Sequence, residues 1–284
     1  MRVPSLPPGR AGDPGLFGPS SMVWRVHRER ALLLSAPAVL LLQLAHPLIA
    51  AAVAEHTNRG RTPAERAGAT IGLNLAVIFG DREQAERAAS HVRNLHARIA
   101  GQMPRAVGSF SAGSPYRADD PELLAWGHAT IVWAGIEAYE TFVSPMSASD
   151  RDRYVAEARS FGAAFGVAAD SLPSTHDELR AYMSSVVKDV LRVGAGARLE
   201  AEEVLRPRGR WVEVAAGPTQ RAVTAGLLPD AVRRGFELPW GLPQRSAFTV
   251  VGAATRAAGR TMPRQLRWWP HYRVAVARLG GGER

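Results

Sequence analysis

The sequence predicts an all-α fold in a single large domain. Apolar residues recur at helical spacing through most of the 284 residues, and no segment alternates apolar and polar residues for long enough to indicate a strand. Hydrophobic residues make up 46% of the chain, which is enough for a substantial core. No internal repeat is visible. We therefore expect an irregular arm over 1–21, one helical domain over 22–279 and a flexible tail over 280–284.

The first 21 residues are rich in proline and glycine, so they are not expected to form a helix. No apolar stretch of the kind found in secretory signal peptides follows the basic start. We therefore expect a cytoplasmic protein. The first helix is expected to begin after Ser20 or Ser21, which are both good capping residues.

Residues 31–54 form the most apolar segment, and by length alone they could span a bilayer. Gln43 and His46 lie inside this segment, however, and polar side chains are costly in lipid. We expect instead a pair of buried helices that is broken near Pro37 and again at Pro47. A re-entrant or interfacial contact with a membrane is the alternative.

Further helices have clear start and stop signals. Thr62, Pro63 and Glu65 match a capping box with proline in the first turn, and Gly80 follows the end of that helix. A second helix is expected over 82–100, and a surface loop over 101–118. The remaining helices are expected at about 121–143, 149–165, 173–191, 197–205, 217–227, 229–236 and 243–259.

The helix expected over 82–100 presents a periodic apolar stripe to the core, formed by Ala88, Val92, Leu95 and Ile99. His91 and His96 flank that stripe on opposite sides, about 140° apart around the helix axis. They therefore cannot both face one small ligand. Periodicity alone does not choose between them.

The net charge of +9 comes almost entirely from arginine, since Lys188 is the only lysine. The arginines are scattered among acidic and apolar residues and form no dense basic run, which argues against a nucleic-acid partner. A peripheral contact with a membrane surface is the stronger alternative. There is no cysteine, which excludes disulfides, thiolate metal sites and covalently attached haem.

The stretch 43–101 concentrates polar side chains within apolar surroundings, as the wall of a buried site would. Polar rings inside a core need a partner or a chemical role. Arg66 and Thr70 are one helical turn apart in this stretch. No phosphate-binding loop, zinc-protease motif or nucleophile elbow is present. The histidines in or beside this apolar region are His46, His56, His91, His96 and His128.

Several short motifs together resemble the catalytic domain shared by MpaB-type oxygenases and rubber oxygenases (latex-clearing proteins). The resemblance extends over about 23–278, and it depends on the order and spacing of the motifs. The motifs are Gln43-Leu44-Ala45-His46-Pro47, Glu55-His56-Thr57, Arg66-x-x-x-Thr70, Ile78-Phe79-Gly80, Leu95-His96-Ala97-Arg98-Ile99-x-Gly101, the run from Asp120 through Trp126 and His128 to Thr130, Leu172-Pro173, Gly226-Leu227-Leu228-Pro229, Pro239-Trp240, and Met262-Pro263-Arg264-x-Leu266-Arg267.

The resemblance implies an all-helical fold with a globin-like core around a buried pocket for non-covalent haem b. It implies that His96 is the proximal iron ligand, and that Arg66 and Thr70 lie on the distal side. Rubber oxygenases can carry a distal lysine directly before that threonine, where this chain has Ala69. The cleavage of rubber is therefore not expected.

We accordingly predict a haem b-dependent oxygenase that uses O2 and a small hydrophobic, isoprenoid or otherwise unsaturated substrate. The alternatives are a helical haem- or lipid-binding protein without turnover, and a non-haem metal oxygenase that uses the same histidines. His46 and Phe79 also have structural interpretations. His46 could satisfy a helix end, and Phe79 could be a core aromatic residue. The predicted catalytic residues are Arg66, Thr70, Glu55 and His56, and the predicted cofactor-binding residues are His96 (the metal ligand), His128, His46 and Phe79.

Overall fold

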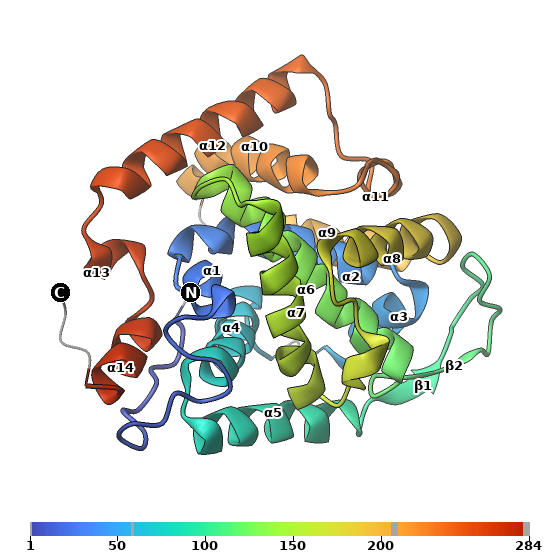
Figure 1. Cartoon of the computed structure of the whole chain (residues 1–284). Coiled ribbons are helices and arrows are strands. Elements are labelled where there is room, and N and C mark those ends of the chain that lie inside the picture. The colour runs from blue at the N-terminus through green and yellow to red at the C-terminus, as the bar shows by residue number, and fades with distance from the viewer. Residues whose placement is uncertain (1, 58–59, 206–209, 281–284) are drawn as a thin grey trace.

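The computed structural model describes residues 2–57, 60–205 and 210–280, with the backbone alone over 210–216. Its architecture confirms the predicted all-α domain (Figure 1). Helix α6 (Pro121–Phe142) crosses the middle of the molecule and contacts η1, α2, α7 and α12. It contributes fully buried aromatic residues to the core, among them Trp126 and Phe142. The end of the predicted tail, 281–284, lies outside the described residues.

The helices follow one another with short connections. Their bounds are α1 Met22–His27, η1 Arg30–Ser35, α2 Ala36–Leu44, α3 Pro47–His56, α4 Pro63–Phe79, α5 Arg82–His96, α6 Pro121–Phe142, α7 Ala148–Ala164, η2 Ala169–Ser171, α8 His176–Asp189, α9 Ala195–Leu205, α10 Arg210–Leu227, α11 Asp230–Gly235, α12 Leu242–Thr261, α13 Arg264–Arg267 and α14 Pro270–Arg278.

The most apolar segment is broken where prolines begin new helices. Pro37 lies in the first turn of α2, and Pro47 is the first residue of α3. Proline suits this position because its missing N–H would have no partner there. No single helix among the described residues is long and apolar enough to cross a membrane, although Arg30–Leu44 and Pro47–His56, bent by 106°, pass that test together.

Helix α4 starts at the predicted capping box. The backbone N–H of Glu65 donates to the Thr62 hydroxyl at 3.2 Å, and the N–H of Thr62 donates to the Glu65 carboxylate at 2.7 Å. Helix α10 starts earlier than predicted, at Arg210, and so contains Pro218 in its interior. The prediction began that helix at 217 and was wrong about this boundary.

The segment after α5 differs from the prediction. Helix α5 ends at His96 rather than near Ala100, and a short antiparallel hairpin follows, with β1 (Ala100–Gln102) paired to β2 (Pro115–Arg117). Three-residue strands are too short to show an alternating pattern, so periodicity does not predict them. A Cβ at Gly101 would lie 2.4 Å from the Tyr116 hydroxyl, so this pairing depends on glycine.

The N-terminal arm contains no helix or strand over residues 2–21, but it is closely packed. The His271 ring lies 2.9 Å from the Pro4 carbonyl, and the Gln84 amide donates to the Pro7 carbonyl at 3.0 Å. Leu6 is buried in the core. The arm therefore joins α4, α5 and α14 from outside.

Candidate functional site

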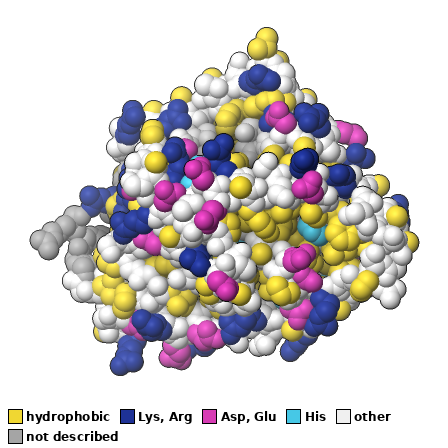
Figure 2. Space-filling model, turned by 45° about the vertical axis from the view of Figure 1, so that its right-hand side comes forward, with side chains coloured by type: hydrophobic (Ala, Val, Ile, Leu, Met, Phe, Trp, Pro, Cys, Tyr) yellow, Lys and Arg dark blue, Asp and Glu magenta, His cyan; other side chains and the backbone are white. Residues whose placement is uncertain are grey.

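Two cavities of about 400 Å³ each lie side by side within the helical core. We call them the His96 cavity and the Arg66 cavity, each after one polar residue that lines it and does not line the other. Figure 2 shows a face of the molecule where apolar side chains gather in a hollow beside a histidine. The residues that line both cavities are Gln43, Ile49, Val53, Thr57, Thr70, Asn74, Ile131 and Phe161.

His96 is the last residue of α5, and its side chain forms part of the wall of the cavity that bears its name. Val92, Leu95 and Ile99 line the same cavity. Three of the four residues in the stripe that was predicted to face the core therefore line this hollow, where Leu95 is 50% exposed, while Ala88 is buried. Burial lowers the pKa of His96, while the nearby Asp119 opposes that shift. A neutral imidazole is the form that binds a metal.

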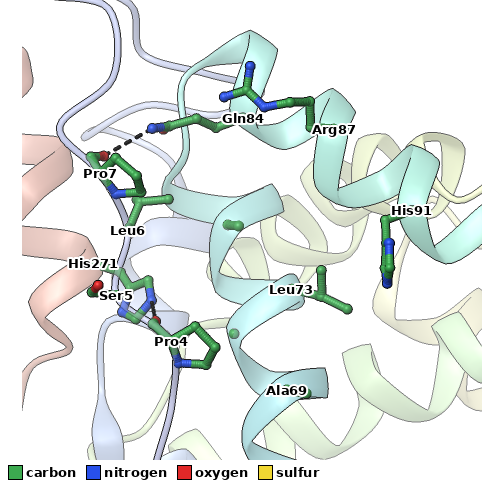
Figure 3. Close-up of a pocket in the computed structure, with 12 residues that line it drawn as sticks. Pro4, Ser5, Leu6, Pro7, Ala69, Leu73, Gln84, Arg87, His91 and His271 are labelled. Carbon is green, nitrogen blue, oxygen red and sulfur yellow. Dashed lines mark hydrogen bonds between the residues drawn. The ribbon is translucent and has the colours of Figure 1, made fainter.

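His91 lines a different hollow, on the side of α4 that the N-terminal arm covers (Figure 3). Its neighbours there include Leu73 and Ala69 of α4, and Arg87 one turn earlier on α5. Of the two histidines on α5, only His96 lines the His96 cavity. The structure thus separates two residues that periodicity alone left equivalent.

His128 of α6 also lines the His96 cavity. Its side chain is only 8% exposed, and its Nδ1 is buried with no hydrogen-bond partner among the described residues. Burial lowers the pKa of His128 to about 4. The ring lies 6.2 Å from the ring of Phe161, and Gly162 provides the space beside it. The cavity therefore contains a second neutral imidazole with unused hydrogen-bonding capacity.

Arg66 and Thr70 project from one side of α4, as their spacing predicted. Arg66 donates to the Arg61 carbonyl at 2.7 Å and forms an ion pair of 3.5 Å with Glu203 of α9. Thr70 lines both cavities, and no hydrogen bond to its hydroxyl is found in the part of the chain that the structure describes. Its hydroxyl is thus available at the wall where the cavities meet.

Asn74 was missed by the sequence analysis. It follows Thr70 by one further turn of α4 and also lines both cavities. The spacing of Arg66, Thr70 and Asn74 is i, i+4 and i+8, which placed all three on one face. A polar stripe along an otherwise apolar helix was the signal that could have found it.

The two candidate acid–base residues occupy different positions. His56 lines the edge of the His96 cavity, with its ring 6.1 Å from that of Tyr116. Glu55 is exposed, accepts a hydrogen bond from the Tyr116 hydroxyl and lines neither cavity. Burial, together with the bond to Glu55, raises the pKa of Tyr116. The hydrogen bond between Tyr116 and Glu55 therefore connects the β-hairpin to α3.

His46 and Phe79 line neither of the two cavities. His46 precedes the first turn of α3 and packs against Phe110, at 5.6 Å between ring centroids. Burial lowers its pKa to about 4. Phe79 lies in the core against Trp24, at 5.5 Å. The structure thus does not bring these two residues together with the other predicted cofactor-binding residues.

The walls of the His96 cavity fit a bulky apolar cofactor that needs one axial ligand from the protein. A haem brings its own four nitrogen ligands, so one accessible neutral histidine is sufficient. No three His, Asp or Glu side chains converge to hold a bare metal ion within 2–57, 60–205 or 217–280, where the structure describes side chains. The non-haem metal site considered from the sequence is therefore not assembled there.

Comparison with known families agrees with this geometry. A family model described as "ER-bound oxygenase mpaB/B'/Rubber oxygenase, catalytic domain" matches residues 24–257. That range includes every residue that lines the His96 cavity. No curated protein and no solved structure gives a match.

Proposed function

Because the chain belongs to the family of MpaB and rubber oxygenase catalytic domains, we propose that it is a haem b-dependent oxygenase acting on a small hydrophobic molecule. The observation that carries this proposal is the pair of adjoining cavities. One contains a neutral histidine in apolar surroundings, and the other offers an apolar chamber beside it. Thr70 lies at their common wall, between the expected positions of cofactor and substrate.

His96 would hold the haem through one ring nitrogen. Asp119, the acidic group that raises the pKa of His96 against the effect of burial, is placed to steady the imidazole electrostatically. His128 would border the bound cofactor and offer it a neutral ring. When bound, the haem would supply the chemistry with O2, which side chains alone cannot perform.

The Arg66 cavity would select the substrate. Most of its wall is aliphatic, with leucine, isoleucine and valine side chains from η1, α2, α3 and α4. Water is poorly accommodated on such a surface, so a hydrophobic substrate gains free energy by displacing it. Arg66 and Thr70 provide the hydrogen-bond donors that would orient a polar or developing negative charge in this chamber.

The absence of a distal lysine agrees with the geometry of α4. Ala69 lines the hollow beneath the N-terminal arm, not the wall shared by the two cavities (Figure 3). We therefore propose that His96 would hold the iron without a lysine, and that Thr70 and Arg66 would border the bound haem and the substrate.

The test is reconstitution of the full chain with haem, followed by an absorption spectrum, a pyridine haemochrome assay and measurement of O2 uptake with unsaturated lipophilic compounds. We expect a b-type spectrum and substrate-dependent O2 uptake. A b-type spectrum without O2 uptake for any such compound would favour a haem-binding protein without turnover. A protein that takes up no haem would contradict the proposal.

A further inference from the structure

The charged side chains in the C-terminal helices of the chain are all positive. Between Glu237 and Glu283 the sequence contains no aspartate or glutamate. This segment forms α12, α13 and α14, which follow one edge of the molecule, coloured orange to red (Figure 1). The seven arginines in this segment are Arg245, Arg256, Arg260, Arg264, Arg267, Arg273 and Arg278.

Between Arg245 and Arg260, the positions of helix α12 that are exposed to solvent carry no charge. Its inner side packs against α10 and α6, where Gly252 lies close to the Thr141 carbonyl. On the outer side, Leu242 is 80% exposed and Val250 is 64% exposed. The exposed positions between and after them at helical spacing, Ser246, Ala253 and Ala257, carry no charge either.

The exposed apolar surface continues beyond α12. Met262 is 41% exposed, and Leu266 in α13 is 61% exposed. Large aliphatic side chains exposed to this extent lose free energy to water unless a partner covers them. No such partner is formed by the described part of the chain.

Arginine and tryptophan border this surface. Arg245, Arg260 and Arg264 are exposed, and the Arg264 guanidinium lies 5.3 Å from the centroid of the Trp268 ring. Glu29, which accepts a hydrogen bond from the Trp268 ring N–H at 3.1 Å, is only 1% exposed. It is engaged by Arg267, at 2.6 Å from Nε to the carboxylate, so it contributes no negative charge to the surface.

We propose that this face, which we call the α12–α13 face (Leu242, Val250, Met262 and Leu266, bordered by Arg245, Arg260 and Arg264), docks the protein on an anionic lipid bilayer. Exposed aliphatic side chains beside arginines, with tryptophan at the edge, are the features by which helices bind in the plane of a membrane interface. Helices α12, α13 and α14 contain no aspartate or glutamate, so their charged side chains all attract anionic lipid.

The position of the face relative to the cavities supports a lipid partner over another polyanion. Trp269, the residue after Trp268, is part of the wall of the Arg66 cavity. Docking would therefore hold that chamber close to the surface where hydrophobic molecules collect. A nucleic acid would use the arginines but would leave the aliphatic side chains in water. The proposal does not depend on the binding of haem.

Sedimentation of the full chain with vesicles tests the proposal. The vesicles are phosphatidylcholine alone, or phosphatidylcholine mixed with phosphatidylserine. We expect binding that requires phosphatidylserine. The variant Arg245→Gln/Arg260→Gln/Arg264→Gln should bind about 100-fold more weakly, since each arginine near an anionic surface contributes about 1 kcal/mol. The variant Leu242→Ser/Leu266→Ser should bind at least about 10-fold more weakly, because it removes two aliphatic side chains that docking would bury.

A matched variant separates the face from net charge. Arg82→Gln/Arg98→Gln/Arg105→Gln removes the same charge from exposed positions outside the face, and it should keep wild-type binding. Equal weakening by this control, or equal binding to both kinds of vesicle, would overturn the proposal. Two further results would also overturn the proposal. One is binding to an oligonucleotide that is stronger than binding to vesicles and that is unchanged in the leucine variant. The other is self-association through Leu242 and Leu266 in a protein that does not bind vesicles.

Discussion

His91 and His96 leave the same helix, five residues apart, and line two different hollows of the protein. His96 lines the apolar His96 cavity with Val92 and Ile99, whereas His91 is exposed and lines the hollow that the N-terminal arm also borders. The two residues therefore form a matched pair, since they have the same side chain on the same helix but face different surroundings.

Replacing His96 with alanine should abolish stoichiometric haem binding. Loss of an outer-shell partner alone weakens metal binding by about 10- to 100-fold, and loss of the ligand itself should exceed that range. His91→Ala is the control and should bind haem like the wild type. Titration with haem, followed by absorption spectroscopy, measures both affinities. Equal loss in the two variants, or none in His96→Ala, would contradict the assignment of His96.

A side chain that fills the His96 cavity should weaken cofactor binding without lowering the stability of the fold. A Cβ added at Gly127 of α6 meets no atom within 4 Å, and this residue lines the cavity. Gly127→Leu should therefore keep or raise stability, because glycine costs a helix about 1 kcal/mol relative to good helix formers. It should nevertheless weaken haem binding at least tenfold by occupying the space.

Gly196→Leu is the control for the Gly127 variant, because a Cβ at Gly196 in α9 also meets no atom within 4 Å, but this position is exposed on the surface. It should leave haem affinity unchanged. Urea unfolding reports the stability of both variants, and haem titration reports binding. Wild-type affinity in Gly127→Leu would show that this cavity is not the haem site.

Helical periodicity and capping predicted the fold well where the signal is local. The capping box at Thr62 and the prolines at 37 and 47 set helix boundaries through backbone chemistry that a single sequence displays. The hairpin around Tyr116 was missed because its strands are held by contacts distant in sequence, including the bond to Glu55.

The candidate site was predicted only in part, for the same physical reason. The spacing of Arg66 and Thr70 placed both on one face, and the structure confirms that face. Whether His91 or His96 faces the interior depends on how α5 packs against α4 and α7, which the sequence of one helix cannot specify. Glu55, His46 and Phe79 lie near the site in sequence. In the folded chain their side chains contact other residues and line neither cavity.

Acid should destabilise the protein through its buried histidines. The pKa of His128 falls from 6.5 to about 4 on folding, so between these values the unfolded chain binds a proton that the folded chain does not. Its contribution to stability is therefore complete above pH 6.5 and is lost as the pH falls towards 4, by about 3 kcal/mol in all. His27 and His46 show the same shift, to about 4.

The variant His128→Leu tests this linkage. Its free energy of unfolding, measured in urea, should fall less steeply than that of the wild type between pH 6.5 and pH 4. The same measurement at pH 7.5 isolates the effect on packing, because the imidazole is neutral there in both states. An unchanged slope would show that His128 is already protonated, or solvated, in the folded protein.

The ion pair between Arg66 and Glu203 allows the chemical role of Arg66 to be separated from a structural one. Both side chains are partly exposed, so the pair should contribute no more than about 1 kcal/mol to stability. Arg66→Gln should retain haem and fold normally, but should lower kcat/KM for O2-dependent substrate oxidation at least tenfold. Glu203→Gln breaks the same pair while keeping the guanidinium, and should lose much less activity. If the two variants lose activity equally, Arg66 acts through its partner on α9 rather than on the contents of the cavity.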